Sequence, residues 1–421
     1  MKYHHEMENA EEKATMAAPF SYANITASQG DYFMLIYVVK SGDTINSIAL
    51  RYGVDPNSII YDNQLVAPYL LAIGQALLLS QGIPIGAEGE IIIPVMTEKR
   101  SVSVGGYAYP FISPYVLEQT LPFLSDLFIF SYGFRADGML ISPVLDDTWM
   151  IILAKSYGVA PVLTLTPFGP DGQFNNRLIS AVVNDLTARE TLKNEVVDQI
   201  QQRGFEGLDI DFEFILASDR DAFVDFVAYM REAVNALGYP VSVALAPKTS
   251  ADQQGLLYEG KNYPALGEAA DYVLLMTYEW GYKYGPPLAV APLNQVRRVL
   301  DYAVTEIPPE KINLGIPNYG YDWPLPFVRG ETIAETIGNI QAVQRALANG
   351  VQIQYDDLSQ APFYNYFMGN IEHEVWFEDV RSMNATFELI EEYGLRGASY
   401  WTIMQLFRAN WLLLTDTFDI R

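Results

Sequence analysis

Residues 206–214 read Glu-Gly-Leu-Asp-Ile-Asp-Phe-Glu-Phe, with acidic and apolar side chains in strict alternation. This period of two is typical of a β-strand, so Asp209, Asp211 and Glu213 are expected to share one of its faces. Neighbours on such a face are about 6–7 Å apart at Cα, so the three carboxyls should not all be ionised near neutral pH. A proton held by Glu213, nearest the end of the strand, would make that residue a general acid.

Similar apolar runs of strand length recur along the chain and alternate with helix-like stretches. Eight such βα units in the C-terminal part predict a (β/α)₈ TIM barrel, an α/β fold, over residues 101–421. A doubly wound open sheet is the alternative, but no glycine-rich phosphate loop follows an early strand. The predicted strands are 101–107, 127–132, 161–166, 207–215, 241–247, 272–278, 312–317 and 397–403.

A smaller unit with the order strand, helix, helix, strand is predicted over residues 34–80. Its sequence Tyr-Val-Val-Lys-Ser-Gly-Asp-Thr, starting at residue 37, and Ile-Gly-Gln-Ala-Leu-Leu-Leu near its end resemble a LysM module. The resemblance implies that this βααβ unit binds chains of N-acetylglucosamine. A unit of this fold without a working groove is the alternative. The residues placed beside the groove by the resemblance are Gly42, Asp43, Thr44 and Asn63.

Composition excludes several classes of function. A formal net charge of −25 argues against a nucleic-acid partner, and the absence of cysteine excludes disulfides and thiolate metal sites. Only three histidines occur, so no metal or other cofactor is expected. No apolar run reaches the ~18–20 residues of a membrane span. We expect no membrane insertion, no signal peptide and a monomer, with residues 1–33 a disordered or added extension and 81–100 a linker.

The acidic stretch resembles the family 18 glycoside hydrolase motif D-G-x-D-x-D-x-E, with Glu206 at the first acidic position. The resemblance implies that Glu213 protonates the leaving oxygen, that Asp211 orients the substrate's acetamido group, and that Asp209 tunes Asp211. The acetamido oxygen then acts as the nucleophile, an exception to two-carboxylate hydrolysis. A site for a hard metal ion and an inert, lectin-like barrel are the alternatives.

Other strand ends extend the resemblance. Met276 and Tyr278 match a Met-x-Tyr pair of the family, in which the tyrosine bonds the acetamido carbonyl, although Met276 also suits core packing. Trp401 matches the tryptophan on which the cleaved sugar stacks, a contact that suits an indole ring. Further candidates for substrate binding are Tyr107, Trp280, Asn318 and Tyr319.

The stretches 106–114, 276–287, 315–323 and 406–411 resemble one branch of the family, the spore cortical fragment-lytic enzymes. The resemblance implies a spore-associated N-acetylglucosaminidase that acts on cortex peptidoglycan during germination. A chitinase or another endo-N-acetylglucosaminidase, and a non-catalytic glycan-binding protein, are the alternatives. Residues 321–396 are expected to be too short for the α+β insertion of many chitinases, so an open cleft is expected.

Overall fold

The computed structural model describes residues 34–80 and 98–421. The expected N-terminal extension and most of the expected linker lie outside the described residues. Within the described parts, no helix combines the length and the apolar character needed to cross a membrane.

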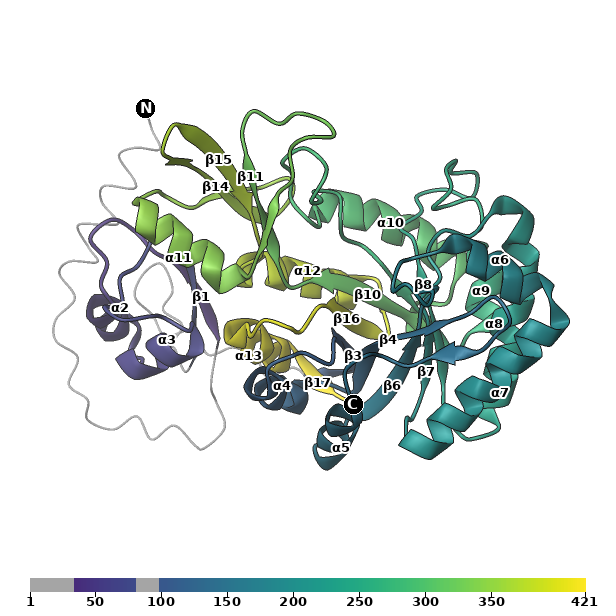
Figure 1. Cartoon of the computed structure of the whole chain (residues 1–421). Helices are drawn as coiled ribbons and strands as arrows, with labels where there is room; N and C mark the ends of the chain where they lie inside the picture. The colour runs from purple at the N-terminus through teal and green to yellow at the C-terminus, as the bar shows by residue number, and fades with distance from the viewer. Residues whose placement is uncertain (1–33, 81–97) are drawn as a thin grey trace.

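Eight parallel strands form a closed barrel, and this confirms the predicted fold (Figure 1). The strands follow the order β3-β16-β10-β9-β8-β7-β6-β4, and pairing of β3 with β4 closes the ring. The barrel strands are β3 (Arg100–Ala108), β4 (Asp126–Phe134), β6 (Ala160–Leu165), β7 (Leu208–Ile210), β8 (Val241–Leu245), β9 (Tyr272–Leu275), β10 (Ile312–Pro317) and β16 (Gly397–Trp401).

Helices surround the barrel, and a continuous apolar core lies between them and the strands. Two short strands extend the sheet: β5 (Leu140–Ile141) pairs with β4, and β17 (Phe418–Ile420) pairs with β3. The barrel helices are α4 (Pro114–Thr120), α5 (Thr148–Ser156), α6 (Asn176–Asn184), α7 (Leu186–Arg203), α8 (Arg220–Asn235), α9 (Tyr263–Ala269), α10 (Leu293–Glu306), α12 (Val380–Glu392) and α13 (Arg408–Thr417).

The strand with the acidic residues is shorter than predicted. β7 ends at Ile210, which is paired with Leu165, the last residue of β6. Beyond this point Asp211 keeps one bond to the neighbouring strand, from its backbone N–H to the Leu165 carbonyl at 2.9 Å. The chain then leaves the sheet because β6 offers it no further partners. Asp211 and Glu213 therefore lie at the rim of the barrel and not within a strand.

The expectation that no insertion fits between the last two barrel strands is wrong. A five-stranded antiparallel sheet and helix α11 (Asn339–Asn349) lie between β10 and β16. Antiparallel strands need only short connections, so the sheet and the barrel helix α12 both fit. The open cleft was expected only because no insertion was expected, so that expectation loses its basis. The inserted strands are β11 (Gly320–Pro324), β12 (Glu335–Ile337), β13 (Gln354–Asp356), β14 (Ala361–Met368) and β15 (Ile371–Trp376).

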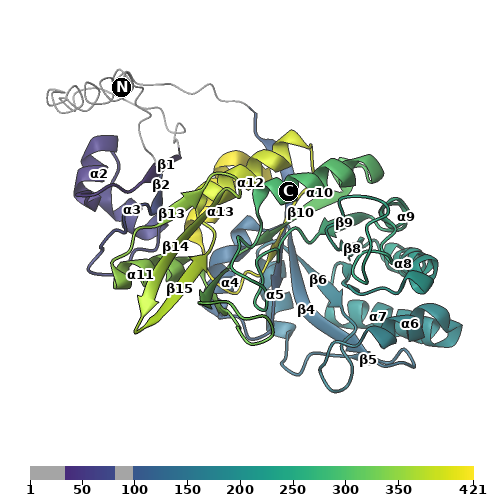
Figure 2. The same ribbon diagram turned by 90° about the horizontal axis from the view of Figure 1, so that it is seen from above.

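The N-terminal unit has the predicted order: β1 (Leu35–Val38), α2 (Ile45–Tyr52), α3 (Pro56–Asp62), β2 (Ala76–Leu79). It is docked on the insertion and on the barrel helices (Figure 2). The backbone N–H of Ile353 donates to the Ile73 carbonyl at 2.9 Å, and that of Arg408 donates to Gln64 Oε1 at 2.7 Å. Gly74 has a φ of +84°, and a Cβ there would lie 1.9 Å from the Ile353 carbonyl oxygen. This contact therefore requires glycine.

Candidate active site

The three predicted acids lie at the carboxyl end of β7, the end of a barrel at which enzymes place their chemistry. Asp209 is fully buried, Asp211 is 6% exposed and Glu213 is half-buried. Exposure thus increases from the barrel interior towards the rim, and Glu213 is the acid best placed to meet a substrate.

Asp209 accepts two hydrogen bonds, one from the neighbouring strand β8 and one from β3, which does not pair with β7. The Tyr107 hydroxyl donates to Oδ2 at 2.8 Å, and the Ser242 hydroxyl donates to Oδ1 at 2.6 Å. Burial raises the pKa of Asp209 to about 6, although both bonds and the charge of Lys261 act to lower it. Tyr107, predicted to bind substrate, is 2% exposed and holds Asp209 through this hydrogen bond.

Asp211 and Glu213 act on each other electrostatically. Burial, followed by the charges of Glu213 and Asp209, raises the pKa of Asp211 well above its ordinary value. Burial also raises the pKa of Glu213; the charge of Lys261 opposes this increase and that of Glu279 adds to it. Asp211 Oδ1 has no hydrogen-bond partner among the described residues. The pair thus retains a proton and offers an unused acceptor beside it.

Tyr278 follows β9 and faces these acids. Burial, then the charges of Asp211 and Glu213, raises its pKa well above the ordinary value, so the phenol stays neutral and can donate a hydrogen bond. Its ring lies against Gly315 on β10, where a Cβ would come within 2.8 Å of Tyr278 Cε1.

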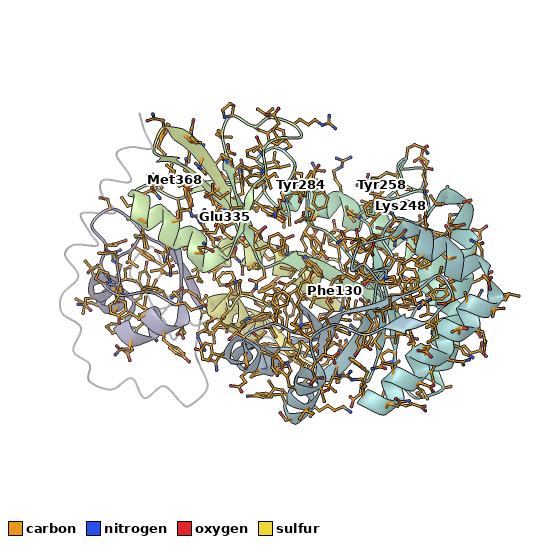
Figure 3. The ribbon with its side chains drawn as sticks, viewed as in Figure 1. Phe130, Lys248, Tyr258, Tyr284, Glu335 and Met368 are labelled. Atoms are coloured by element: carbon orange, nitrogen blue, oxygen red, sulfur yellow. The ribbon has the colours of Figure 1, made fainter. Side chains whose placement is uncertain are left out.

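Aromatic side chains form one wall of the site. Trp401, half-buried at the end of β16, meets the ring of Phe130 edge-on at 4.9 Å and that of Tyr107 at 5.6 Å. Met276 packs against the same cluster. Phe130, which lies over the barrel strands in Figure 3, was not singled out from the sequence. Its place within the predicted strand 127–132 was the available signal.

A second group of residues approaches from β9 and the insertion. Tyr319 and Tyr321 both donate their hydroxyls to Glu279 Oε1, the latter at 2.9 Å. Tyr319, a predicted substrate contact, is thereby tied to an acid whose charge raises the pKa of Glu213. Glu279 was not predicted, although it directly follows Tyr278 in the sequence.

Two other predicted contacts have side chains engaged within the protein. Asn318 is 2% exposed, and its Nδ2 donates to the carbonyls of Thr402 at 3.0 Å and Gln405 at 2.9 Å. Its amide therefore braces the loop after β16. Trp280 packs against the main apolar core.

The predicted groove residues of the N-terminal unit divide into two kinds. Gly42 and Thr44 are exposed; Thr44 caps α2, and Asp43 accepts from the Tyr37 hydroxyl at 2.5 Å. Asn63 is buried, and its amide is saturated by bonds to the Ile59 carbonyl and to both backbone groups of Leu78. Asn63 thus shapes the unit from inside.

The alternative of a metal site finds no support in the geometry. Among residues 34–80 and 98–421, no group of three or more His, Cys, Asp or Glu side chains is arranged to hold a metal ion.

Comparison with protein families accounts for both parts of the chain. Residues 169–405 match the family "Glycosyl hydrolases family 18", and residues 37–80 match the LysM domain. The chain therefore belongs to family 18 of the glycosyl hydrolases, and it is a glycoside hydrolase preceded by a LysM domain.

Its relatives narrow the class further. The chain is 36% identical to the cortical fragment-lytic enzyme of Bacillus subtilis, over 92% of this chain and 99% of that protein. The crystal structure of the Bacillus cereus spore cortex-lytic enzyme SleL superposes with a TM-score of 0.87 at 32% identity, covering 92% of this chain and 98% of that one. A chitinase from Chromobacterium violaceum, 24% identical with a TM-score of 0.69 over 75% of this chain and 99% of its own, shares the fold.

Proposed function

We propose that the protein hydrolyses β-1,4 N-acetylglucosaminyl linkages in cortex peptidoglycan fragments during spore germination, and that it is associated with the spore. The names of its relatives support this substrate. One observation carries the chemistry. Among the described residues Asp211 Oδ1 has no hydrogen-bond partner, and burial raises the pKa of the nearby Glu213 carboxyl.

Cleavage begins with proton transfer from Glu213 to the glycosidic oxygen, which leaves as a hydroxyl. The acetamido carbonyl oxygen of the same sugar attacks the anomeric carbon as that bond breaks, forming an oxazolinium ion. Asp211 accepts a hydrogen bond from the acetamido N–H and offsets the positive charge. Glu213, now ionised, removes a proton from a water molecule. The water oxygen attacks the anomeric carbon and opens the oxazolinium ring, with net retention of configuration.

The remaining site residues hold the sugar and the acids. Tyr278 donates to the acetamido carbonyl, and Trp401 stacks under the sugar being cleaved, with Met276 against it. Asp209, held by Tyr107, keeps Asp211 in place. Tyr319 holds Glu279 by a hydrogen bond, and the charge of Glu279 raises the pKa of Glu213. Trp280 and Asn318 shape the surrounding loops.

The LysM domain anchors the enzyme on its polymer. The turn at Gly42, Asp43 and Thr44 is the proposed contact with the glycan. Gly42 and Thr44 are exposed, whereas the side chain of Asp43 is 7% exposed and is held by Tyr37. The buried Asn63 sets the shape of the loop at residues 62–64. We assign residues 34–80 to this domain, 81–100 to a linker and 101–421 to the catalytic domain. The charge of −25 favours a monomer, because copies of the protein repel each other.

A Glu213→Gln variant tests this proposal. Wild type should release fragments with N-acetylglucosamine at the reducing end from purified cortex, as read by chromatography and mass spectrometry. The variant should lose about 10²–10⁴-fold in rate, the usual contribution of a general acid. Glu206→Gln, in the same motif but paired with Lys155 at 3.0 Å and 37% exposed, is the matched control and should stay active.

Chitin oligomers are the second candidate substrate, because the structure contains an α+β insertion of the kind expected in chitinases. If wild type leaves cortex fragments intact but cuts chitin oligomers, the mechanism holds and the cortex assignment fails. If it binds both glycans and cuts neither, the proposed chemistry is wrong.

A further inference from the structure

A lysine is buried directly behind the acidic stretch. Lys261 lies just before α9, in the segment that follows β8, and is only 1% exposed. Its ammonium donates to the carbonyl of Phe212 and, at 3.0 Å, to that of Ala244. Phe212 stands between Asp211 and Glu213, so the positive charge is fixed at the backbone that carries the two acids. The ring of Phe223 lies 5.3 Å from the same nitrogen.

The burial of this cluster limits its net charge. Asp209, Asp211 and Glu213 are all influenced by Lys261, whose charge acts against the burial that raises the pKa of each acid. Net charge in a desolvated site is costly. With the ammonium present, one of the three carboxyls can be ionised while the cluster stays neutral; without it, neutrality requires all three to be protonated.

We propose that Lys261 is a positioning residue that keeps one negative charge on the Asp209–Asp211 pair while Glu213 retains its proton. This inference rests on the roles assigned above to Glu213 and Asp211. The reaction needs both forms at once, because the oxazolinium ion requires an anionic neighbour and the leaving oxygen requires a proton. Lys261 itself touches no reacting atom.

Lys261 carries its positive charge at acidic and neutral pH. Burial lowers its pKa to about 8, while the charges of Asp211, Glu213 and Asp209 act to raise it. The other ionisable groups facing the acids are phenols and one carboxyl. Tyr107 and Tyr278 are neutral phenols because burial raises the pKa of each well above its ordinary value. Glu279, bound by two tyrosines, adds negative charge on the side of Glu213.

The effect of the Lys261 charge on the pKa values of the three acids determines how the rate should depend on pH. The charge of Lys261 lowers the pKa of each acid, so its removal raises all three. The acid limb of the rate profile, which reports ionisation of the aspartate pair, should move to higher pH. The alkaline limb, which reports loss of the Glu213 proton, should move in the same direction.

Two variants separate the charge from the hydrogen bonds. Lys261→Gln retains donors for the two carbonyls and removes the charge, whereas Lys261→Met removes both. Initial rates of fragment release from cortex, measured at low substrate from pH 4 to 9, should show both limbs shifted upward by about one unit in both variants. The rate at pH 5 should then fall about tenfold, with a smaller loss near pH 7.

Lys248 provides a matched control. It is also buried, 4% exposed, in the segment after β8 (Figure 3), and donates to backbone carbonyls including that of Lys261 at 3.1 Å. Burial lowers its pKa, and the charges acting on it are those of Arg220, Glu306 and Asp252, outside the acidic cluster. Lys248→Met should reduce thermal stability and leave both limbs of the profile in place.

Several outcomes would overturn the proposal. A uniform loss of rate without a shift would make Lys261 a structural brace, and a normal profile in Lys261→Gln alone would assign its effect to hydrogen bonds. If neither single variant folds, the double variant Lys261→Met with Asp209→Asn removes one charge of each sign and should fold. Failure of this charge-balanced variant to fold would also overturn the proposal. Activity in Glu213→Gln would instead refute the roles proposed above, whatever the Lys261 variants do.

Discussion

Asp209 must be stable when buried in the barrel and must also be able to ionise beside Asp211. It is 0% exposed, yet its two oxygens accept bonds from Tyr107 and Ser242, which are the partners an ionised carboxylate needs. Burial raises its pKa to about 6, which places its titration close to neutral pH. Each donor therefore influences both the stability of the barrel and the charge available to Asp211.

Tyr107→Phe, which removes one oxygen atom, tests whether this donor controls both the stability of the barrel and the ionisation of Asp209. The ring should keep its stacking on Phe128, whose centroid is 4.5 Å away, while the hydroxyl is lost. Loss of a donor raises the pKa of Asp209, so the acid limb of the rate profile should move upward and the loss of rate should be largest at low pH. An unpaired buried acceptor should also cost about 1–3 kcal/mol in free energy of unfolding.

Tyr132→Phe is the control for that substitution, since its hydroxyl donates to another buried acid, Asp147, at 2.7 Å among the helices. Its melting temperature should fall by a similar amount with no shift in the profile. Equal shifts in the two variants would show that the tyrosine bond to Asp209 has no special role.

The elements that could be predicted from the sequence are those with a simple period. All eight barrel strands were located because each is an apolar run between helical stretches. The end of β7 was not, because alternation continues through Phe214 while the pairing partner on β6 stops at Leu165. Where a strand ends depends on the length of its neighbour in the sheet, and the sequence of the strand alone does not show this.

The insertion was missed for a related reason. Strands β14 and β15 alternate clearly, but the length of residues 321–396 was taken to be too short for an insertion together with a barrel helix. In the site, the acids, Tyr278 and Trp401 were found from motifs. Lys261 was not, because a lone lysine in a loop shows no sign of the strand end that it faces. Glu279 was also missed, although it directly follows the predicted strand 272–278.

Gly315→Ala tests how β10 positions the site. A Cβ at this position would lie 2.3 Å from the Leu275 carbonyl and 2.8 Å from the Tyr278 ring, so Tyr278 must move. We expect kcat to fall by at least tenfold in variants that still fold, because misplacement of a binding group by about 1 Å is costly. Activity and circular dichroism melting, measured together, check this.

The matched control is Gly267→Ala in α9, where the atoms nearest to the added methyl group belong to the side chain of Ile307, at 3.0 Å. It should keep normal kcat, since Ile307 can adjust. Unchanged kcat in Gly315→Ala would show that Tyr278 is not placed by its contact with β10.

At the scale of the whole molecule, the LysM domain and the catalytic domain are joined by apolar packing as well as by hydrogen bonds. Leu78 of β2 belongs to the main apolar core of the barrel, and Ala72 belongs to the core beneath the inserted sheet. Arg381 donates to the Gly74 carbonyl at 3.2 Å. The docked arrangement fixes the exposed turn at Gly42 relative to the acids at the end of β7, so that a glycan held by one domain has a defined position at the other.

This docking predicts a single cooperative unfolding transition for wild type and its loss in Gly74→Ala. The methyl group would clash with the Ile353 carbonyl, 1.9 Å away, and a side chain at φ +84° is strained by itself. Gly238→Ala, at φ +88° with nothing within 4 Å of the added Cβ, isolates the cost of that strain, about 1–2 kcal/mol.

Scanning calorimetry should show one transition at slightly reduced temperature in Gly238→Ala. It should show two transitions in Gly74→Ala, because the undocked LysM domain then melts separately from the barrel. One transition in both variants would mean that the contact at Gly74 does not couple the domains, and the fixed position of the glycan-binding turn would lose its support.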